Sequence, residues 1–244
     1  MSISPITIEG ITRELHKAFE IFNKHYFGNT LPMTAITIQS SSHLRHAMGW
    51  CTTKPVWGDR KGKVQMYEIN ISAEYLDLDF FETMDTLLHE MIHLFHKVHG
   101  IKDTSRNNTY HNKHFKNKAL ELGFEYESNK PDPQHGWTYA RLGQKAIERT
   151  AKFDIDRSKF VIARKGSAYF SQVQQLLEEQ GGEIGEEMLD EVDVMPARET
   201  VAVMERRPSS YKWKCPTCEQ SIRSTRMKVN ILCGDCMETL ERVD

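Results

Sequence analysis

The chain has 244 residues, of which 39% are hydrophobic and 27% are charged. This length and composition allow one good-sized domain with a small module, or two modest domains, and exclude a wholly disordered protein. The 32 Lys and Arg residues nearly balance the 34 Asp and Glu residues, so the net charge of −2 does not indicate a nucleic-acid or membrane surface. We find no leader peptide and no apolar run of about 18 residues, and therefore expect a cytoplasmic protein, nucleoid association included, without a membrane partner.

The first part of the chain predicts one helix followed by extended segments. Residues 10–27 place apolar side chains at helical spacing, with Thr12 as the expected cap and Gly28 as the stop. Three segments then alternate apolar with polar residues, at 36–40, 47–52 and 64–72. We expect these segments to form a small antiparallel sheet.

Residues 80–98 return to helical spacing, and apolar side chains wrap much of this helix, so we expect it to be buried. Gly100 ends the helix, and a polar loop leads to another helix within residues 114–124, closed by Gly123. Residues 1–127 therefore predict one domain of the α+β class.

The remaining chain divides into two parts. Residues 128–205 hold a locally basic stretch with a strand-like segment at 160–166 and an acidic connector at 178–193, and we assign this part no function. Residues 206–244 contain two CxxC pairs, formed by Cys215, Cys218, Cys233 and Cys236. Four thiolates at this spacing are typical of a zinc ribbon with a closed structural site; an iron site or two disulfides are the alternatives.

Residues 89–93 read His-Glu-Met-Ile-His, an HExxH motif on the buried helix. Residues four apart share a helix face, so the imidazoles of His89 and His93 can bind one zinc ion. Zinc lowers the pKa of bound water towards ~7, and Glu90 is the expected general base. A chance pattern is the alternative, but burying these groups without a function would cost free energy. The motif predicts a zincin-like metalloprotease domain.

A third protein ligand is needed, and the residues alone leave several candidates. His96 lies about 10 Å along the helix axis from His89, so we expect it beside the site and not on the same ion. His99 would require a glycine turn that the sequence lacks. The other candidates follow the polar loop: His111, His114, Glu121 and Glu125. Their position favours one of the two histidines, and spacing does not separate them.

The order of these motifs over residues 10–127 resembles the SprT-like (Spartan-related) family of zinc metalloproteases. HExxH is followed by HxxxF, matched by His111 and Phe115, downstream of a helix ending NKHYFGNTLP and the strands ITIQS and EINIS. The resemblance implies that His111 is the third ligand and that His114 is a surface residue. Such proteins often end in a zinc ribbon, as the cysteines here indicate, whereas residues 128–205 match no motif.

Basic residues surround the two CxxC pairs, with aromatic residues between them. Phosphate contacts and stacking on rings would bind single-stranded DNA, and the candidates are Lys212, Trp213, Lys214, Arg223, Arg226 and Lys228. The alternative is that these are ordinary surface charges and that the rings cap the small core of the ribbon. The family resemblance favours DNA contact.

Two functions of different classes follow. The first is a zinc metallopeptidase with one catalytic and one structural zinc ion, acting on proteins, DNA-bound or DNA-crosslinked ones included, in crosslink repair or a stress response. The segment at 47–51 would align an extended substrate by edge pairing. The second is a non-catalytic, zinc-stabilised protein that binds nucleic acid or the transcription machinery. The intact Glu90 favours the enzyme, because a scaffold needs the histidines but no general base. The substrate, any activation by DNA and the oligomeric state stay open.

Overall fold

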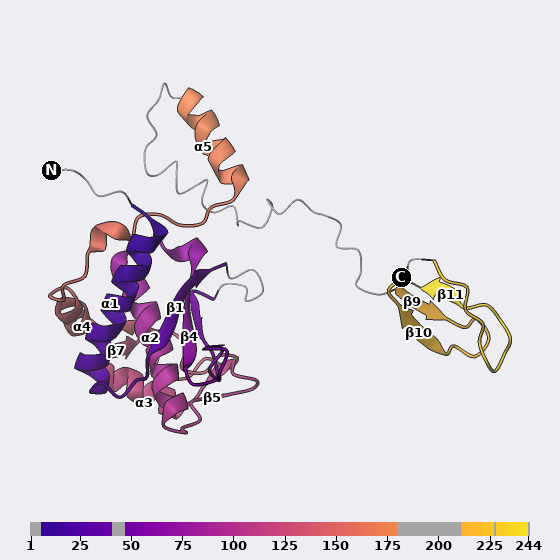
Figure 1. Cartoon of the computed structure of the whole chain (residues 1–244), viewed down its shortest axis with the longest axis horizontal. Coiled ribbons are helices and arrows are strands. Elements are labelled where there is room, and N and C mark those ends of the chain that lie inside the picture. The colour runs from indigo at the N-terminus through magenta and orange to yellow at the C-terminus, as the bar shows by residue number, and fades with distance from the viewer. Residues whose placement is uncertain (1–5, 41–46, 180–210, 227, 244) are drawn as a thin grey trace. The chain divides into compact units, whose positions relative to one another are not determined.

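A computed structural model of the chain describes residues 6–40, 47–179, 211–226 and 228–243 (Figure 1). The chain divides into two compact units, Met1–Arg164 and Lys165–Asp244. The first unit combines helices with small sheets, as the α+β prediction requires. In the described residues, no helix is long and apolar enough to cross a membrane.

Helix α1 (Ile8–Phe27) opens the first unit and begins two residues before the predicted range of 10–27. The Thr7 hydroxyl accepts a hydrogen bond from the Gly10 N–H at 3.0 Å, and Gly28 ends the helix at φ 60°. The prediction that Thr12 caps this helix was wrong, because its hydroxyl donates to the Ile8 carbonyl inside the helix at 2.8 Å. Ile8, the first residue of the helix, is exposed and lies outside the apolar stripe, so the apolar pattern could not reveal this start.

The main sheet of the first unit has four strands: β1 (Thr34–Gln39), β2 (Gly49–Cys51), β3 (Trp57–Gly58) and β4 (Gln65–Ser72). β4 lies between β1 and β2, pairing in parallel with β1 and antiparallel with β2 and β3. The prediction of an antiparallel sheet was therefore wrong for β1. β2 lies on the opposite side of β4 from β1 and runs antiparallel to both strands. β4 follows β2 with reversed direction and therefore runs parallel to β1.

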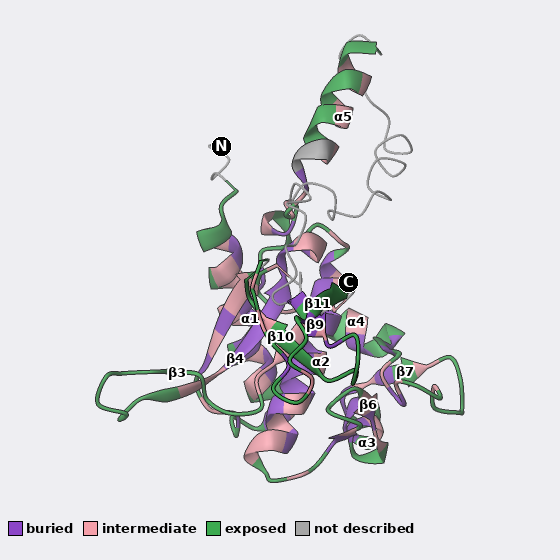
Figure 2. Cartoon of the chain, turned by 90° about the vertical axis from the view of Figure 1, so that its right-hand side faces the viewer, coloured by how far each residue is buried: buried purple, intermediate pink, exposed green. Residues whose placement is uncertain are grey.

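Helix α2 (Phe80–Val98) confirms the range predicted from helical spacing. It packs on β2 and β4 and also contacts α1 and α3 (Lys113–Leu122). Gly123, in the left-handed conformation, ends α3 as predicted. The core is built mainly from α1, α2 and β4, whose buried residues are purple in Figure 2, and its fully buried side chains include Ile11, Leu15, Phe22, Ile69, Met84 and Leu88.

Short elements complete the first unit: η1 (Ala73–Tyr75), β5 (Thr104–Ser105), β6 (Tyr110–His111), β7 (Phe124–Tyr126), β8 (Ala140–Leu142), α4 (Gln144–Thr150) and η2 (Arg157–Lys159). The segment without an assigned function contributes to the same core through Leu142, Ile155 and Phe160. The strand predicted at 160–166 was wrong. That stretch has no regular structure, and its Arg164 N–H donates to the Ala73 carbonyl at 2.7 Å.

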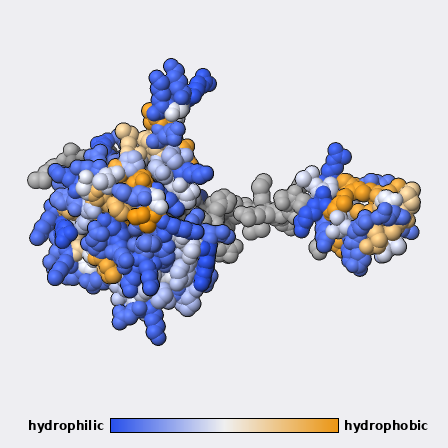
Figure 3. Space-filling model, turned by 90° about the horizontal axis from the view of Figure 1, so that it is seen from below, coloured by the Kyte–Doolittle hydropathy of each residue, from blue (hydrophilic) through white to orange (hydrophobic). Residues whose placement is uncertain are grey.

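The second unit contains α5 (Ser167–Glu179) and a three-stranded antiparallel sheet. β9 (Tyr211–Lys214) is the central strand, between β10 (Ser221–Ser224) and β11 (Glu241–Val243). The predicted acidic connector lies outside the described residues from position 180 onwards. Apolar side chains are exposed on the C-terminal sheet and its loops (Figure 3), namely Ile222, Leu232, Met237 and Val243.

Candidate metal centre

Three histidines from two elements converge beside α2. His89 and His93 lie one turn apart on α2, and β6 brings His111 opposite them. The Nε2 atom of His111 lies 3.2 Å from Nε2 of His89 and 3.1 Å from Nε2 of His93. Two ligands at ~2.0 to 2.1 Å from a tetrahedral zinc ion stand roughly 3.3 Å apart, so this cluster fits such an ion.

The environment keeps two of these imidazoles neutral, which is the form that binds a metal. Burial and the neighbouring His93 and His111 hold the pKa of His89 well below its usual range. Burial and the charge of His93 lower the pKa of His111 to about 4. At neutral pH these rings therefore present free nitrogen lone pairs.

Phe115 explains the spacing of the downstream motif. Its ring lies under all three imidazoles, with centroids 4.6 Å from His89, 4.9 Å from His93 and 4.6 Å from His111. The side chain is fully buried, so it supports the cluster from the core side. His114, one residue earlier, is exposed and lies outside the cluster, as the resemblance implied.

Asp103 is a site residue that the sequence interpretation missed. One of its oxygens, Oδ2, lies 2.6 Å from Nδ1 of His93 and 3.3 Å from Nδ1 of His96. Asp103 is fully buried, and burial raises its pKa, but the hydrogen bond and charge of the two histidines hold that pKa well below its usual range. A carboxylate on Nδ1 leaves Nε2 of His93 directed at the metal position. The only sequence signal was an acid in the polar loop.

A turn at residues 132–137 supports His111. The His111 N–H donates to the His135 carbonyl at 2.9 Å, and the Trp137 N–H donates to the His111 carbonyl at 3.0 Å. Gly136, between them, has φ 70°, and a Cβ there would collide with the His111 carbonyl oxygen. A glycine is therefore required for this close approach. The sequence interpretation did not include this turn in the site.

Glu90 lies against strand β2. A Cβ on Gly49 would lie 2.8 Å from a Thr86 methyl group and 3.3 Å from Cγ of Glu90, so glycine lets the strand approach α2 at this position. Burial raises the pKa of Glu90 to about 7, and the Cys51 backbone N–H opposes that rise. The carboxyl group can therefore exchange a proton near neutral pH. Burial also raises the pKa of the Cys51 thiol, which fits a packed residue.

The other candidate ligands lie elsewhere in the first unit. The His99 Nδ1 atom lies 2.8 Å from the Phe95 carbonyl at the end of α2, so its ring closes the helix. Glu121 pairs with Lys118 at 2.8 Å. His96 is buried beside Asp103, which matches the expectation of a residue next to the site. Of the candidates for the third position, only His111 joins His89 and His93 in the described cluster.

The comparison with protein families rests on this same region. The model of the SprT-like family matches residues 15–135, which include most of α1, the main sheet, the histidine cluster and most of the turn behind His111. Residues 15–135 belong to the SprT-like family. Comparison with curated proteins gives no match. Family membership indicates that the SprT-like region is a metallopeptidase-like domain with groups that can hold a metal ion.

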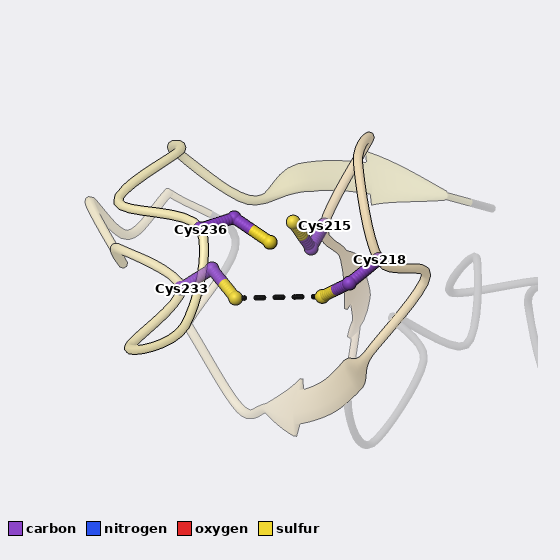
Figure 4. Close-up of side chains that lie close together, drawn as sticks. All are labelled: Cys215, Cys218, Cys233 and Cys236. Atoms are coloured by element: carbon purple, nitrogen blue, oxygen red, sulfur yellow. Dashed lines mark hydrogen bonds between the residues drawn. The ribbon is translucent and has the colours of Figure 1, made fainter.

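A second cluster, separate from the SprT-like region, is formed by Cys215, Cys218, Cys233 and Cys236. Their sulfur atoms lie within 4.8 Å of one another and point to a common centre (Figure 4). The two loops are alike: the Cys215 and Cys233 N–H groups each donate to the carbonyl five residues on, at 2.8 Å. A residue with positive φ follows each pair, Glu219 at 63° and Met237 at 57°. The donor set fits a closed tetrahedral metal site.

The local backbone favours a thiolate at this second cluster. Backbone N–H groups of Cys218 and Thr217 lower the pKa of Cys215 to about 7. These donors stabilise negative charge on the sulfur, which a metal requires of its cysteine ligands.

The basic residues around the cysteines lie on β9, on β10 and in the loop that follows β10. Lys212, Arg223, Arg226 and Lys228 are exposed, whereas Lys214 pairs with Glu219 at 3.1 Å. Trp213 is only 8% exposed and packs with Tyr211 and Leu240 in the core of this sheet. Its ring is therefore not available to stack on a base. Its position agrees with the alternative that the aromatic rings cap the small core of the ribbon.

Proposed function

We propose that this chain is a zinc-dependent metallopeptidase of the SprT-like type, which hydrolyses peptide bonds of proteins. The observation that carries the proposal is the approach of three histidines to one point, with a buried glutamate one residue along the helix from the first. His89, His93 and His111 would hold the ion. Bound zinc would supply Lewis acidity, lowering the pKa of a water molecule and polarising a peptide carbonyl.

Residues of the chain would transfer the proton during hydrolysis and hold the metal-binding histidines in position. Glu90 accepts a proton from the attacking water and returns it to the leaving amine, and its pKa of about 7 suits both steps. Asp103 holds the imidazole of His93 in one tautomer and orientation. The turn at Gly136 holds His111 in place through backbone hydrogen bonds.

Strand β2 is the proposed guide for the substrate backbone. It lies at the end of the strand order β1-β4-β2 and contacts α2 at Glu90. Among the described strands, only β4 pairs with β2. An extended peptide adding to the open edge would receive backbone hydrogen bonds, which align a scissile carbonyl without reading side chains. We therefore expect the peptidase to accept many different substrate sequences.

The cluster of four cysteines would hold a structural zinc ion, and the exposed cations around it are the proposed phosphate contacts of the C-terminal sheet. Lys212, Arg223, Arg226 and Lys228 offer charge for single-stranded DNA, without stacking on Trp213. Proteins bound or crosslinked to DNA are the substrates that such contacts would bring to the peptidase. A role in crosslink repair or in a stress response follows from that substrate class.

The test is cleavage of a DNA-binding protein by the zinc-loaded chain and by Glu90→Gln, with and without single-stranded DNA. We expect the variant to bind zinc as the wild type does and to lose at least about 100-fold in rate, because it lacks the general base. Equal cleavage by both proteins would reject the mechanism. Absence of cleavage in the zinc-loaded wild type, with DNA binding retained, would favour the non-catalytic binding protein.

A further inference from the structure

The hairpin of β3 and the start of β4 exposes an aromatic ring on the SprT-like region. Trp57 is 47% exposed, although it pairs with Met66 within the sheet. Val56 and Val64, on the two arms of the hairpin, are exposed as well. Figure 2 shows β3 and its turn in green, extending away from the body of the first unit. Core packing does not account for an apolar group of this kind.

The Trp57 ring is held in place by a buried acid. Its indole N–H donates to Oε2 of Glu68 at 2.5 Å, and the Gln39 amide donates to the other oxygen of Glu68 at 3.2 Å. Glu68 is itself buried, and its backbone N–H donates to the Thr52 hydroxyl at 3.0 Å. The exposed ring is therefore already oriented, so a ligand that stacks on it loses little side-chain entropy.

The turn of the hairpin engages the one acid of the segment. The Asp59 carboxylate accepts a hydrogen bond from the Val64 N–H at 2.8 Å, and the Asp59 carbonyl accepts one from the Gly62 N–H at 3.0 Å. Backbone N–H groups lower the pKa of Asp59, so it stays ionised within the turn.

The hairpin concentrates positive charge in a chain that is slightly negative overall. Residues 54–64 contain four cations and one acid, a net charge of +3, against −2 for the whole chain. The cations are Lys54, Arg60, Lys61 and Lys63, all exposed. No ion pair joins any of these four to another residue in the described parts of the chain. Their charge is therefore open to an anionic partner.

The hairpin lies next to strand β2 along the same edge of β4. Cys51 pairs with Ile69 and Trp57 pairs with Met66, so the two residues are three positions apart along β4, about 10 Å at strand spacing. The Cys51 backbone N–H is the group that faces Glu90. Trp57 bonds to Glu68, and side chains alternate along β4, so a ligand on Trp57 would lie next to the strand proposed to guide the substrate but on the face of the sheet opposite Glu90.

We propose that this hairpin binds single-stranded nucleic acid, with a base stacked on Trp57 and phosphates on the surrounding cations. A duplex does not offer a free base face, and an acidic peptide offers charge with few flat rings. This inference deepens the proposed function and rests on it only for the consequence that the bound strand lies next to β2, the strand proposed to guide the substrate. The peptidase region thus has its own nucleic-acid contact, independent of the C-terminal sheet.

The experiment measures anisotropy of a fluorescein-labelled 15-nucleotide oligo-dT with the full zinc-loaded chain carrying Glu90→Gln, which prevents self-cleavage. We expect Trp57→Ala to weaken binding about tenfold or more, and Trp57→Phe to stay within about threefold, because phenylalanine keeps a stacking face. Both variants lose the bond to Glu68, so the phenylalanine variant controls for that loss. Thermal unfolding and zinc content establish that each variant is folded.

The charge contacts are tested by the salt dependence of binding. Removing Lys61 and Lys63 together, as K61Q/K63Q, should reduce the slope of log K against log salt by about 1.4, at ~0.7 per phosphate contact. K145Q/K152Q, which removes two exposed lysines of the α4 region, is the matched control and should leave the slope unchanged.

Three results would overturn the proposal. Binding unaffected by Trp57→Ala would remove the stacking contact, and loss of binding confined to K212Q/R226Q would place all DNA contact on the C-terminal sheet. Displacement of the oligonucleotide by poly-glutamate at equal charge would reduce the surface to a site for any polyanion. Since no hydrolysis is measured, these results are independent of whether the chain is a peptidase.

Discussion

At the scale of single residues, the histidine cluster depends on a carboxylate that is not itself a ligand. Asp103 has no contact with solvent, and one oxygen serves both His93 and His96. Its other oxygen, Oδ1, has no hydrogen-bond partner among the described residues. A carboxylate buried in this way costs free energy unless its charge is used. Here it is used to orient and polarise His93.

We predict that Asp103→Asn lowers zinc affinity about 10- to 100-fold, because the amide cannot supply the negative charge that makes His93 a stronger ligand. Competition with a chromophoric chelator measures the affinity without reference to activity. Asp85→Asn is the matched control: Asp85 is also a buried acid, on α2 itself, but its carboxylate accepts from the Leu142 N–H at 2.8 Å. Equal losses in both variants would show a general effect on folding.

Asp85 makes a separate prediction for stability against pH. Burial raises its pKa in the folded chain to about 6, above the ordinary value of 3.8. The folded state therefore binds more protons than the unfolded state in this window, and the contribution of Asp85 to stability falls as pH rises from about 4 to about 6. Asp85→Asn keeps an acceptor for Leu142 and removes this fall.

The measurement for Asp85 is urea unfolding of the wild type and of Asp85→Asn between pH 5 and pH 7.5. As pH rises across this range, the free energy of unfolding of the variant should increase relative to that of the wild type by on the order of 1 kcal/mol. The comparison cancels the titration of groups that both proteins share. A constant difference between the two proteins would contradict the assignment.

At the scale of elements, close backbone approach holds the site together. The turn at 132–137 reaches His111 from a segment outside the helix and strand motifs, and it does so through Gly136. We predict that Gly136→Ala lowers the free energy of unfolding by about 2 kcal/mol or more and weakens zinc binding, because the methyl group displaces the turn from His111. Thermal unfolding with and without zinc measures both effects.

Gly62 provides the control for that substitution. It also has φ 70°, but a Cβ there would meet no atom within 4 Å. Gly62→Ala therefore adds the backbone strain alone, about 1 kcal/mol, and should leave zinc affinity unchanged. A zinc affinity reduced as much by Gly62→Ala as by Gly136→Ala would mean that contact with His111 is not the cause.

At the scale of the whole molecule, the two units differ in what stabilises them. The first unit, which contains the SprT-like region, has a continuous core. The buried core of the C-terminal sheet consists only of a few described residues, Tyr211, Trp213, Cys215, Cys233 and Leu240. A core of this size does not stabilise a fold alone, so the metal would supply most of the folding free energy.

We predict that Cys218→Ser lowers bound zinc from two ions per chain to one and unfolds the C-terminal sheet. The first unit should stay folded and keep its zinc ion. Metal analysis gives the stoichiometry, and tryptophan fluorescence reports Trp213 becoming exposed. His93→Ala should remove the other ion and leave the C-terminal sheet intact. Loss of both ions from either variant would indicate that the two sites are coupled.

Much of the site was predictable because its signals are local. Helical spacing gave residues 80–98 for α2, and the i, i+4 relation placed His89 and His93 on one face. The CxxC pairs indicated a cluster from spacing alone, and the structure brings their four sulfur atoms together. The third histidine needed the family resemblance, since spacing did not separate His111 from His114.

Tertiary structure decided what depends on segments distant in sequence. The contact of Asp103 with His93, the support of His111 by Gly136 and the hold of Glu68 on Trp57 each join separate elements. Likewise the parallel pairing of β1 with β4 and the burial of Trp213 follow from how strands pack. Periodicity and motif spacing report a residue's own element, whereas these contacts are set by how the elements pack on one another, which no local pattern records.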